Sequence, residues 1–125
     1  MRRFVIQGEP VSAKNSQQIR FNRKTGARYI TKSKAAAEWQ ADAIAQLVKQ
    51  RGRTKTLRGD VRVQFVAYQR GRRDLDNIAS AVLDALKKSL VIADDMQVTA
   101  LAGEKVTLKD CAPCIEIVVA PIGES

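Results

Sequence analysis

The sequence predicts an α+β fold in which a mixed β-sheet is covered by two helices. Four segments have residue patterns that predict β-strands, and two others repeat apolar residues at helical spacing. Their order is strand, polar arm, helix, strand, helix, strand, strand, which is typical of a sheet with helices packed on it. The length of 125 residues suits one small domain, which we expect to span residues 1–125.

The first half of the chain supplies one strand and one long helix. Arg2–Gly8 alternates weakly and is predicted as the first strand. Ser33 is a suitable N-cap for a helix over Lys34–Arg51, and Gly52 is a suitable residue to end it. Apolar residues at helical spacing predict its buried stripe: Ala36, Trp39, Ala43, Ile44, Leu47 and Val48.

A polar and basic segment, Glu9–Ala27, follows the first strand. Arg20–Phe21 and Arg28–Ile30 are predicted to pair as a hairpin across Asn22–Ala27. Two interpretations are open for this region, a solvated loop or a cationic arm that contacts phosphates, and we favour the arm. Its cations are Lys14, Arg20, Arg23, Lys24 and Arg28.

The second half supplies the remaining strands and the second helix. Val61–Tyr68 alternates and is predicted as a strand, and apolar residues at helical spacing predict a helix over about Asn77–Leu90. Met96–Leu108 and Ile115–Ala120 are predicted as two further strands joined by a turn at Lys109–Pro113.

Charge and composition narrow the function. The 22 Lys and Arg residues outnumber the 13 Asp and Glu residues, giving a net charge of +9. Such a charge favours a polyanionic partner, although a merely soluble basic protein is the alternative. No long basic amphipathic helix is present, which favours nucleic acid over a membrane surface. Histidine is absent, which excludes histidine general bases and histidine-coordinated zinc.

The apolar segments predict where the protein is located, and the two cysteines predict its thiol chemistry. No apolar run is long enough to span a membrane or serve as a signal peptide, so we expect a cytoplasmic protein. Cys111 and Cys114 form a lone CxxC pair. Zinc would need further ligands and a redox pair normally opens a helix, whereas a strand-like run follows Cys114. We therefore expect two reduced structural thiols.

Two pairs of carboxylates flank the predicted second helix. Asp74 and Asp76 are two residues apart, and in an extended segment they point to the same side. A third acid, Asp94 or Asp95, would complete a site for a divalent cation, which prefers hard oxygen ligands. Each acid also has a plain structural explanation. Asp76 could be the N-cap of the helix, Asp74 could pair with a neighbouring arginine, and Asp94-Asp95 could be turn residues.

Helix length separates the two pairs. A helix of ~13 residues rises ~20 Å, so Asp95 leaves from the end opposite Asp76. A shared site then requires either a connector that runs back along the helix or a second copy of the chain.

Four short motifs stand out along the chain. They are Asp74-Leu75-Asp76-Asn77, Leu83-Asp84-Ala85-Leu86, Asp94-Asp95-Met96-Gln97 and, near the N-terminus, Gly8-Glu9-Pro10-Val11. Together they resemble the RusA-like Holliday junction resolvases of bacteria and their phages. The resemblance covers most of the chain in order, and Asp74–Asn77 followed at this distance by Asp94–Gln97 is its specific part.

The resemblance implies a bacterial or phage-encoded homodimeric endodeoxyribonuclease. Such an enzyme uses Mg²⁺ or Mn²⁺ to resolve four-way DNA junctions by paired symmetric nicks. The family's catalytic, metal-binding aspartates correspond to Asp74, Asp76 and Asp95, and Asp94 is the neighbouring acid in the metal set. Metals held by carboxylates can activate water and neutralise a phosphate without histidine. The basic arm and three further arginines, Arg70, Arg72 and Arg73, are expected to hold the DNA.

One position departs from the family's pattern. The family often carries a lysine four residues after the second aspartate, and this chain has Ser80 there. Lys87, Lys88 or Arg73 could supply the missing charge. Two alternatives therefore stay open beside the resolvase: a non-catalytic DNA-binding protein, and a nuclease for flaps or forks.

Overall fold

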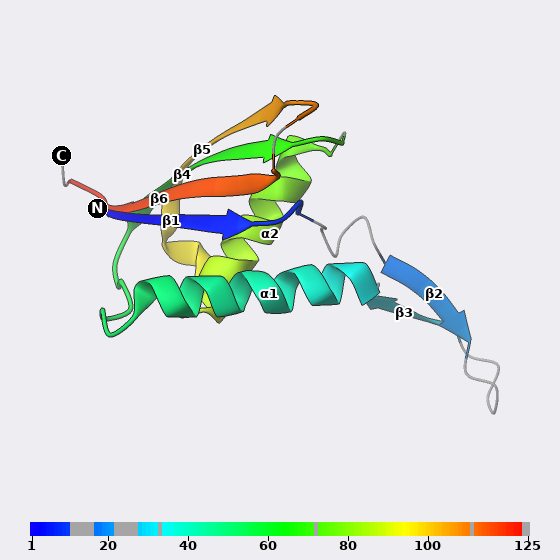
Figure 1. Ribbon diagram of the computed structural model, residues 1–125. Coiled ribbons are helices and arrows are strands. Elements are labelled where there is room, and N and C mark those ends of the chain that lie inside the picture. The colour runs from blue at the N-terminus through cyan, green and yellow to red at the C-terminus, as the bar shows by residue number, and fades with distance from the viewer. Residues whose placement is uncertain (11–16, 22–27, 33, 72, 111, 124–125) are drawn as a thin grey trace.

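The computed structural model describes residues 1–10, 17–21, 28–32, 34–71, 73–110 and 112–123, and it has the predicted α+β fold (Figure 1). A four-stranded mixed sheet is covered by two helices, and a separate two-stranded hairpin extends from it. The elements in order are β1 (Arg2–Gln7), β2 (Gln17–Phe21), β3 (Arg28–Lys32), α1 (Lys34–Arg51), β4 (Val61–Gln69), α2 (Leu75–Lys88), the 3-10 turn η1 (Asp95–Gln97), β5 (Val98–Thr107) and β6 (Cys114–Pro121).

The strand order of the main sheet is β1-β6-β4-β5. β6 pairs antiparallel with both β1 and β4, whereas β4 and β5 are parallel, with Val61 opposite Val98 and Gln69 opposite Thr107. Parallel neighbours need a crossover connection, and α2 is that crossover. α2 therefore starts at the carboxyl end of β4 and returns the chain to the amino end of β5, which fixes where the two acid pairs lie.

The core lies between the sheet and the helices, which share one face of the sheet (Figure 1). Every second residue of β4, from Val61 to Gln69, is buried. α1 buries Ala36, Trp39, Ala43 and Leu47. Burying a side chain such as that of Leu47 stabilises the fold by about 1.5–3 kcal/mol. The prediction was wrong for Val48, which is 43% exposed. It lies beyond the edge of the stripe that faces the sheet, whereas Trp39 is in the core as expected.

The start of α2 differs from the prediction. The N-cap is Asp74, with extended backbone angles, and its carbonyl accepts the first helical bond from the N–H of Ile78. Asp76 thus lies in the first turn and is not the cap, and Asn77 is not the first helical residue. Two aspartates two residues apart both satisfy the N-cap preference, so propensity could not choose between them.

The end of α2 also differs. Leu90 was predicted to be part of the helical apolar stripe, but it has a φ of 62° and is 53% exposed. The N–H groups of Leu90 and Val91 bond back to the carbonyls of Lys87 and Leu86, respectively, which closes the helix with a Schellman motif.

The hairpin predicted in the basic arm is confirmed. β2 and β3 pair antiparallel with Phe21 opposite Arg28 and Arg20 opposite Tyr29. The hairpin projects past the amino end of α1, away from the main sheet (Figure 1). Five predicted DNA-binding or thiol residues lie outside the described residues: Lys14, Arg23, Lys24, Arg72 and Cys111. In the described part of the chain, no helix is long and apolar enough to cross a membrane.

Candidate functional site

The first acid corner lies where β4 ends and α2 begins. Asp74 is the N-cap of α2, and Asp76 is exposed in its first turn. The side-chain amide of Asn77, which is buried, donates a hydrogen bond to the carboxylate of Asp74 over 3.3 Å. The amino end of a helix carries a partial positive charge, which favours ionised carboxylates there. The corner therefore presents two anionic side chains, one of them held by an amide.

A glutamate from β1's end anchors the loop that leads to Asp74. Oε1 of Glu9 accepts hydrogen bonds from the backbone N–H groups of Arg70 at 3.2 Å and Gly71 at 2.8 Å. A Cβ at Gly71 would lie 3.2 Å from the same oxygen, so glycine allows this close approach. Gly8 has a φ of +112° and donates to the carbonyl of Pro113, which fixes the turn before Glu9. Glu9 is thus a positioning residue for the first corner.

The end of β5 is tied to this corner by a cation. Nζ of Lys105 donates to the carbonyl of Arg73 over 3.0 Å. The predicted DNA-binding residues Arg70 and Arg73 are therefore at the first acid corner, together with Lys105, while Arg72 lies outside the described residues. Positive charge beside the carboxylates is the arrangement that attracts a phosphodiester.

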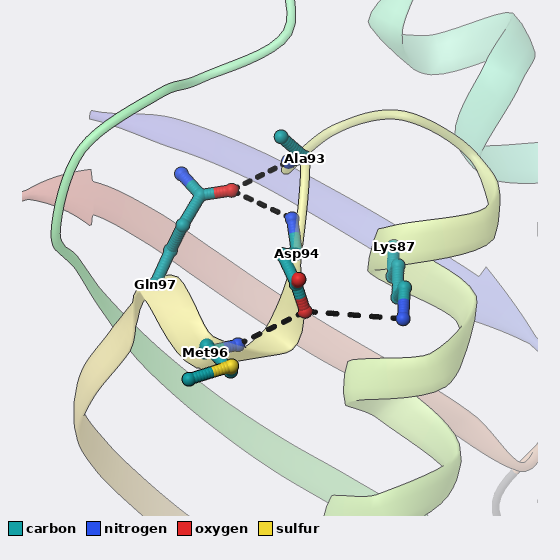
Figure 2. A network of polar contacts seen from close by, with 5 residues as sticks. All are labelled: Lys87, Ala93, Asp94, Met96 and Gln97. Carbon is teal, nitrogen blue, oxygen red and sulfur yellow. Dashed lines mark hydrogen bonds and ion pairs between the residues drawn. The ribbon is translucent and has the colours of Figure 1, made fainter.

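The second acid corner is the turn between α2 and β5. Figure 2 shows Asp94 as the N-cap of η1, in a capping box closed by Gln97. Oε1 of Gln97 accepts from the N–H groups of Ala93 at 2.6 Å and Asp94 at 2.7 Å. Nε2 of Gln97 donates to the carbonyls of Leu57 and Gly59. One amide side chain therefore fastens the acid turn to the connector before β4.

The charge on Asp94 is stabilised by its neighbours. The hydrogen bond between the side chains of Asp94 and Asp95 is the main cause that lowers the pKa of Asp94 below its ordinary value. The N–H of Met96 lowers it further, and so does Lys87, whose Nζ lies 3.8 Å from Oδ1 of Asp94 (Figure 2). Slight desolvation opposes these effects. Asp94 is thus an anion at neutral pH, as a metal ligand must be.

The two corners lie at opposite ends of α2. The helix has 14 residues and rises about 20 Å at ~1.5 Å per residue. The connector after the helix does not run back: the N–H groups of Val91 and Ile92 bond to the carbonyl of Leu86, which keeps it at the carboxyl end. Within the described residues of one chain, no three acidic or thiol groups converge as a metal site would require. A returning connector, one of the two routes open from the sequence, is therefore excluded.

The sequence reasoning identified the acids but not the residues that hold them. Asn77 and Gln97 each fix an aspartate turn, and Glu9 fixes the loop before Asp74. All three lie in the short motifs already singled out, so their polar character beside the acids was the available signal. Arg58 was also not assigned; it is exposed between Leu57 and Gly59, beside the second corner.

The comparisons with known proteins agree with the motifs. The family model for endodeoxyribonuclease RusA matches residues 8–120, which is most of the chain. Among the curated proteins, no significant match is found. The matched range includes β4, α2, η1 and β5, and thus both acid corners. The chain therefore belongs to the RusA endodeoxyribonuclease family.

Proposed function

We propose that the protein is a structure-selective endodeoxyribonuclease that resolves four-way (Holliday) DNA junctions as a homodimer. Membership of the RusA family supports nuclease activity on such junctions. The observation that carries the rest of the proposal is the separation of two acid corners across α2, each with cations beside it. Within the described residues of one chain no three acidic side chains converge, whereas one corner from each of two chains would bring four carboxylates together.

In this proposal each active site combines residues of two copies. One copy contributes Asp74 and Asp76, and the other contributes Asp95 together with Asp94. Two-fold symmetry then creates two identical sites, which suits an enzyme that must cut two strands of a junction symmetrically. A single copy would bind DNA without completing a site.

The donor set fits Mg²⁺ or Mn²⁺. Both ions prefer carboxylate oxygens and retain several waters, and the acids of both corners are partly or fully exposed. When bound, the metal would supply an activated water and neutralise charge on the scissile phosphate. The chain's own residues would do the rest: Asn77 orients the carboxylate of Asp74, and Gln97 orients the turn of Asp94.

Because Ser80 stands where the family often has a lysine, another cation would have to bind the scissile phosphate. Ser80 is exposed on α2 and carries no charge. In the proposed dimer, the cations beside each site would come from both copies, Lys105 and Arg73 from one and Lys87 and Arg58 from the other. Lys88 is paired with Asp84 and is a weaker candidate. These side chains would hold the phosphodiester against the carboxylates.

Ser80 also favours the second candidate, a DNA-binding protein without nuclease activity.

The proposed nuclease activity is tested by cleavage of a synthetic four-way junction with Mg²⁺, by the parent protein and by Asp76→Asn. We expect the parent to nick paired strands and the variant to lose on the order of 100-fold or more in rate while it still binds the junction. Asp42→Asn, an exposed acid on α1, is the matched control and should cut at the parent rate.

Binding of the junction without nicking by the parent, under either metal, would favour the non-catalytic protein. Comparing rates on flaps and forks separates the third candidate, because a flap or fork nuclease would prefer those substrates to the intact junction.

A further inference from the structure

Buried side-chain polar atoms that have no hydrogen-bond partner are concentrated around the first acid corner. Leaving such an atom unpaired is costly, so a group of them calls for a partner such as a bound water. Among the described residues that carry them, only Arg2 lies toward the other end of the sheet, on a level with Val63 of β4. The atoms in this part of the chain are Nη1 of Arg2, Nε1 of Trp39, Nε2 and Oε1 of Gln69, Nε of Arg73 and Oδ1 of Asn77.

Gln69 is the most deeply buried of these residues. It is the last residue of β4 and is 0% exposed. Burial alternates along β4, so Gln69 is on the sheet face that packs against the helices, together with Val63, Phe65 and Ala67. Its backbone carbonyl accepts from the N–H of Leu108, but neither atom of its side-chain amide has a partner among the described residues. An apolar side chain would suit this interior better, so packing alone does not explain the glutamine.

Asn77 faces the interior from the first turn of α2 and is 4% exposed. Its Nδ2 donates to Oδ2 of Asp74 over 3.3 Å, whereas its Oδ1 has no partner in the described part of the chain. The two ends of a side-chain amide have nearly the same shape, and only hydrogen bonds decide which end points where. A donor to Oδ1 would hold the amide with its nitrogen toward the carboxylate. The orientation of Asp74 therefore depends on such a donor.

Gln69 is placed to supply it. Only residues 70–74 join β4 to α2, and both amides are buried at this end of the interior. The amides do not bond to each other, but one water can accept from Nε2 of Gln69 and donate to Oδ1 of Asn77. Interior waters occur where about two to four polar groups surround them. The indole N–H of Trp39 adds a donor at this end, since Cδ1 of that ring lies 3.9 Å from the Cβ position of Gly8.

We propose that Gln69 is a positioning residue of the first acid corner, joined to Asn77 by an interior water that holds the Asn77 amide toward Asp74. The inference deepens the proposed function and rests on it for its catalytic consequence, because Asp74 is one of the proposed metal ligands. The path of hydrogen bonds runs from the end of β4 through the first turn of α2 to the carboxylate. The core of the fold thus sets the direction in which Asp74 points.

Urea unfolding without metal tests the coupling of the two amides. Gln69→Met keeps the length of the side chain and removes its polar atoms. We expect a lower urea midpoint than that of the parent, because the water and Oδ1 of Asn77 lose a partner. In an Asn77→Ala background the same substitution should lower the midpoint less, since that oxygen is already gone. Gln64→Met, which changes an exposed glutamine of the same strand, is the matched control and should keep the midpoint of the parent.

A buried amide that served no purpose would give the opposite result. A midpoint raised by Gln69→Met, or lowered equally with and without Asn77, would overturn the proposal. A crystal structure of the parent should show a water within hydrogen-bond distance of both amides. A contact between the two side chains with no water there would overturn the bridge.

Junction cleavage measured against Mg²⁺ concentration separates this inference from the proposed function. Gln69→Met should raise the Mg²⁺ concentration for half-maximal rate on the order of tenfold and change the rate at saturating Mg²⁺ less, because a metal ligand is less well oriented. An unchanged Mg²⁺ requirement, with a parent that cleaves, would refute the positioning role and leave the nuclease intact. Coupled urea midpoints and a bound water, with a parent that does not cleave, would refute the nuclease and leave the amide bridge intact.

Discussion

At the residue scale, two amide side chains hold the aspartates of the two acid corners in place. Asn77 donates to the carboxylate of Asp74, and Gln97 accepts from the backbone around Asp94 while it donates to Leu57 and Gly59. Ligand orientation by such neighbours commonly affects metal affinity or activity by about 10–100-fold. The acids could be identified from the sequence because carboxylates are scarce in a chain of net charge +9. The roles of their supporting amides could not be assigned, although both lie in the same motifs, because hydrogen bonds to side chains depend on local geometry.

The first prediction concerns Asn77. Asn77→Ala removes the hydrogen bond to Asp74 and leaves that carboxylate less restrained. We expect the rate of junction cleavage to fall on the order of tenfold, because a metal ligand would lose its orienting partner. Junction affinity in a gel-shift assay without metal should not change. Ser80→Ala, an exposed position one turn further along α2, is the control, and an equal loss in both variants would contradict the orienting role.

The second prediction concerns Gln97. Its side chain accepts two hydrogen bonds and donates two, across the acid turn and the connector. Gln97→Ala should lower the free energy of unfolding by about 2 kcal/mol, since each such bond contributes roughly 0.5–1.5 kcal/mol and water replaces some of them. Urea denaturation measures this change. Arg58→Ala, exposed on the same connector, should lie within about 0.5 kcal/mol of the parent.

At the scale of elements, two glutamines of α1 determine that the β1 edge of the main sheet is covered. The side chain of Gln50 accepts from the N–H of Val5 and donates to its carbonyl, and Gln46 makes the same pair of bonds with Gln7. Gln46 and Gln50 are four residues apart, so both face β1 from one side of the helix. Helical and strand periodicity predicted α1 and β4 closely, because burial on one face sets both patterns. Periodicity did not predict which edge of the sheet is covered. That depends on polar side chains at exposed helical positions, where the apolar pattern carries no information.

The third prediction tests that cover. Changing both glutamines, Gln46→Ala and Gln50→Ala, opens the edge of β1 and leaves its outward peptide groups to water or to another strand. The open edge of β1 can then pair with a strand of another copy, so the protein should form larger assemblies as its concentration rises. Light scattering or analytical ultracentrifugation measures this. Lys49→Ala, exposed on the same helix, should keep the size of the parent, and a double variant of unchanged size would show that the cover is dispensable.

The parallel pairing of β4 and β5 determines the site at the scale of the whole molecule. It makes α2 a crossover, and this crossover places Asp76 and Asp95 about one helix length apart. The sequence predicted the helix between the acids and therefore their separation. It could not exclude a returning connector, because that depends on the bonds from Val91 and Ile92 to Leu86.

Mixing two inactive variants tests the composite site most directly. Asp76→Asn and Asp95→Asn should each abolish junction cleavage alone. If each site joins corners of two copies, a dimer of one copy of each variant has one site with both substitutions and one site with neither. Variants unfolded and refolded together at equal concentration should regain about a quarter of the parent's nicking rate, and cut one strand per junction. If the co-refolded mixture is as inactive as each variant alone, while the parent refolded in the same way cleaves the junction, sites shared between two copies are contradicted.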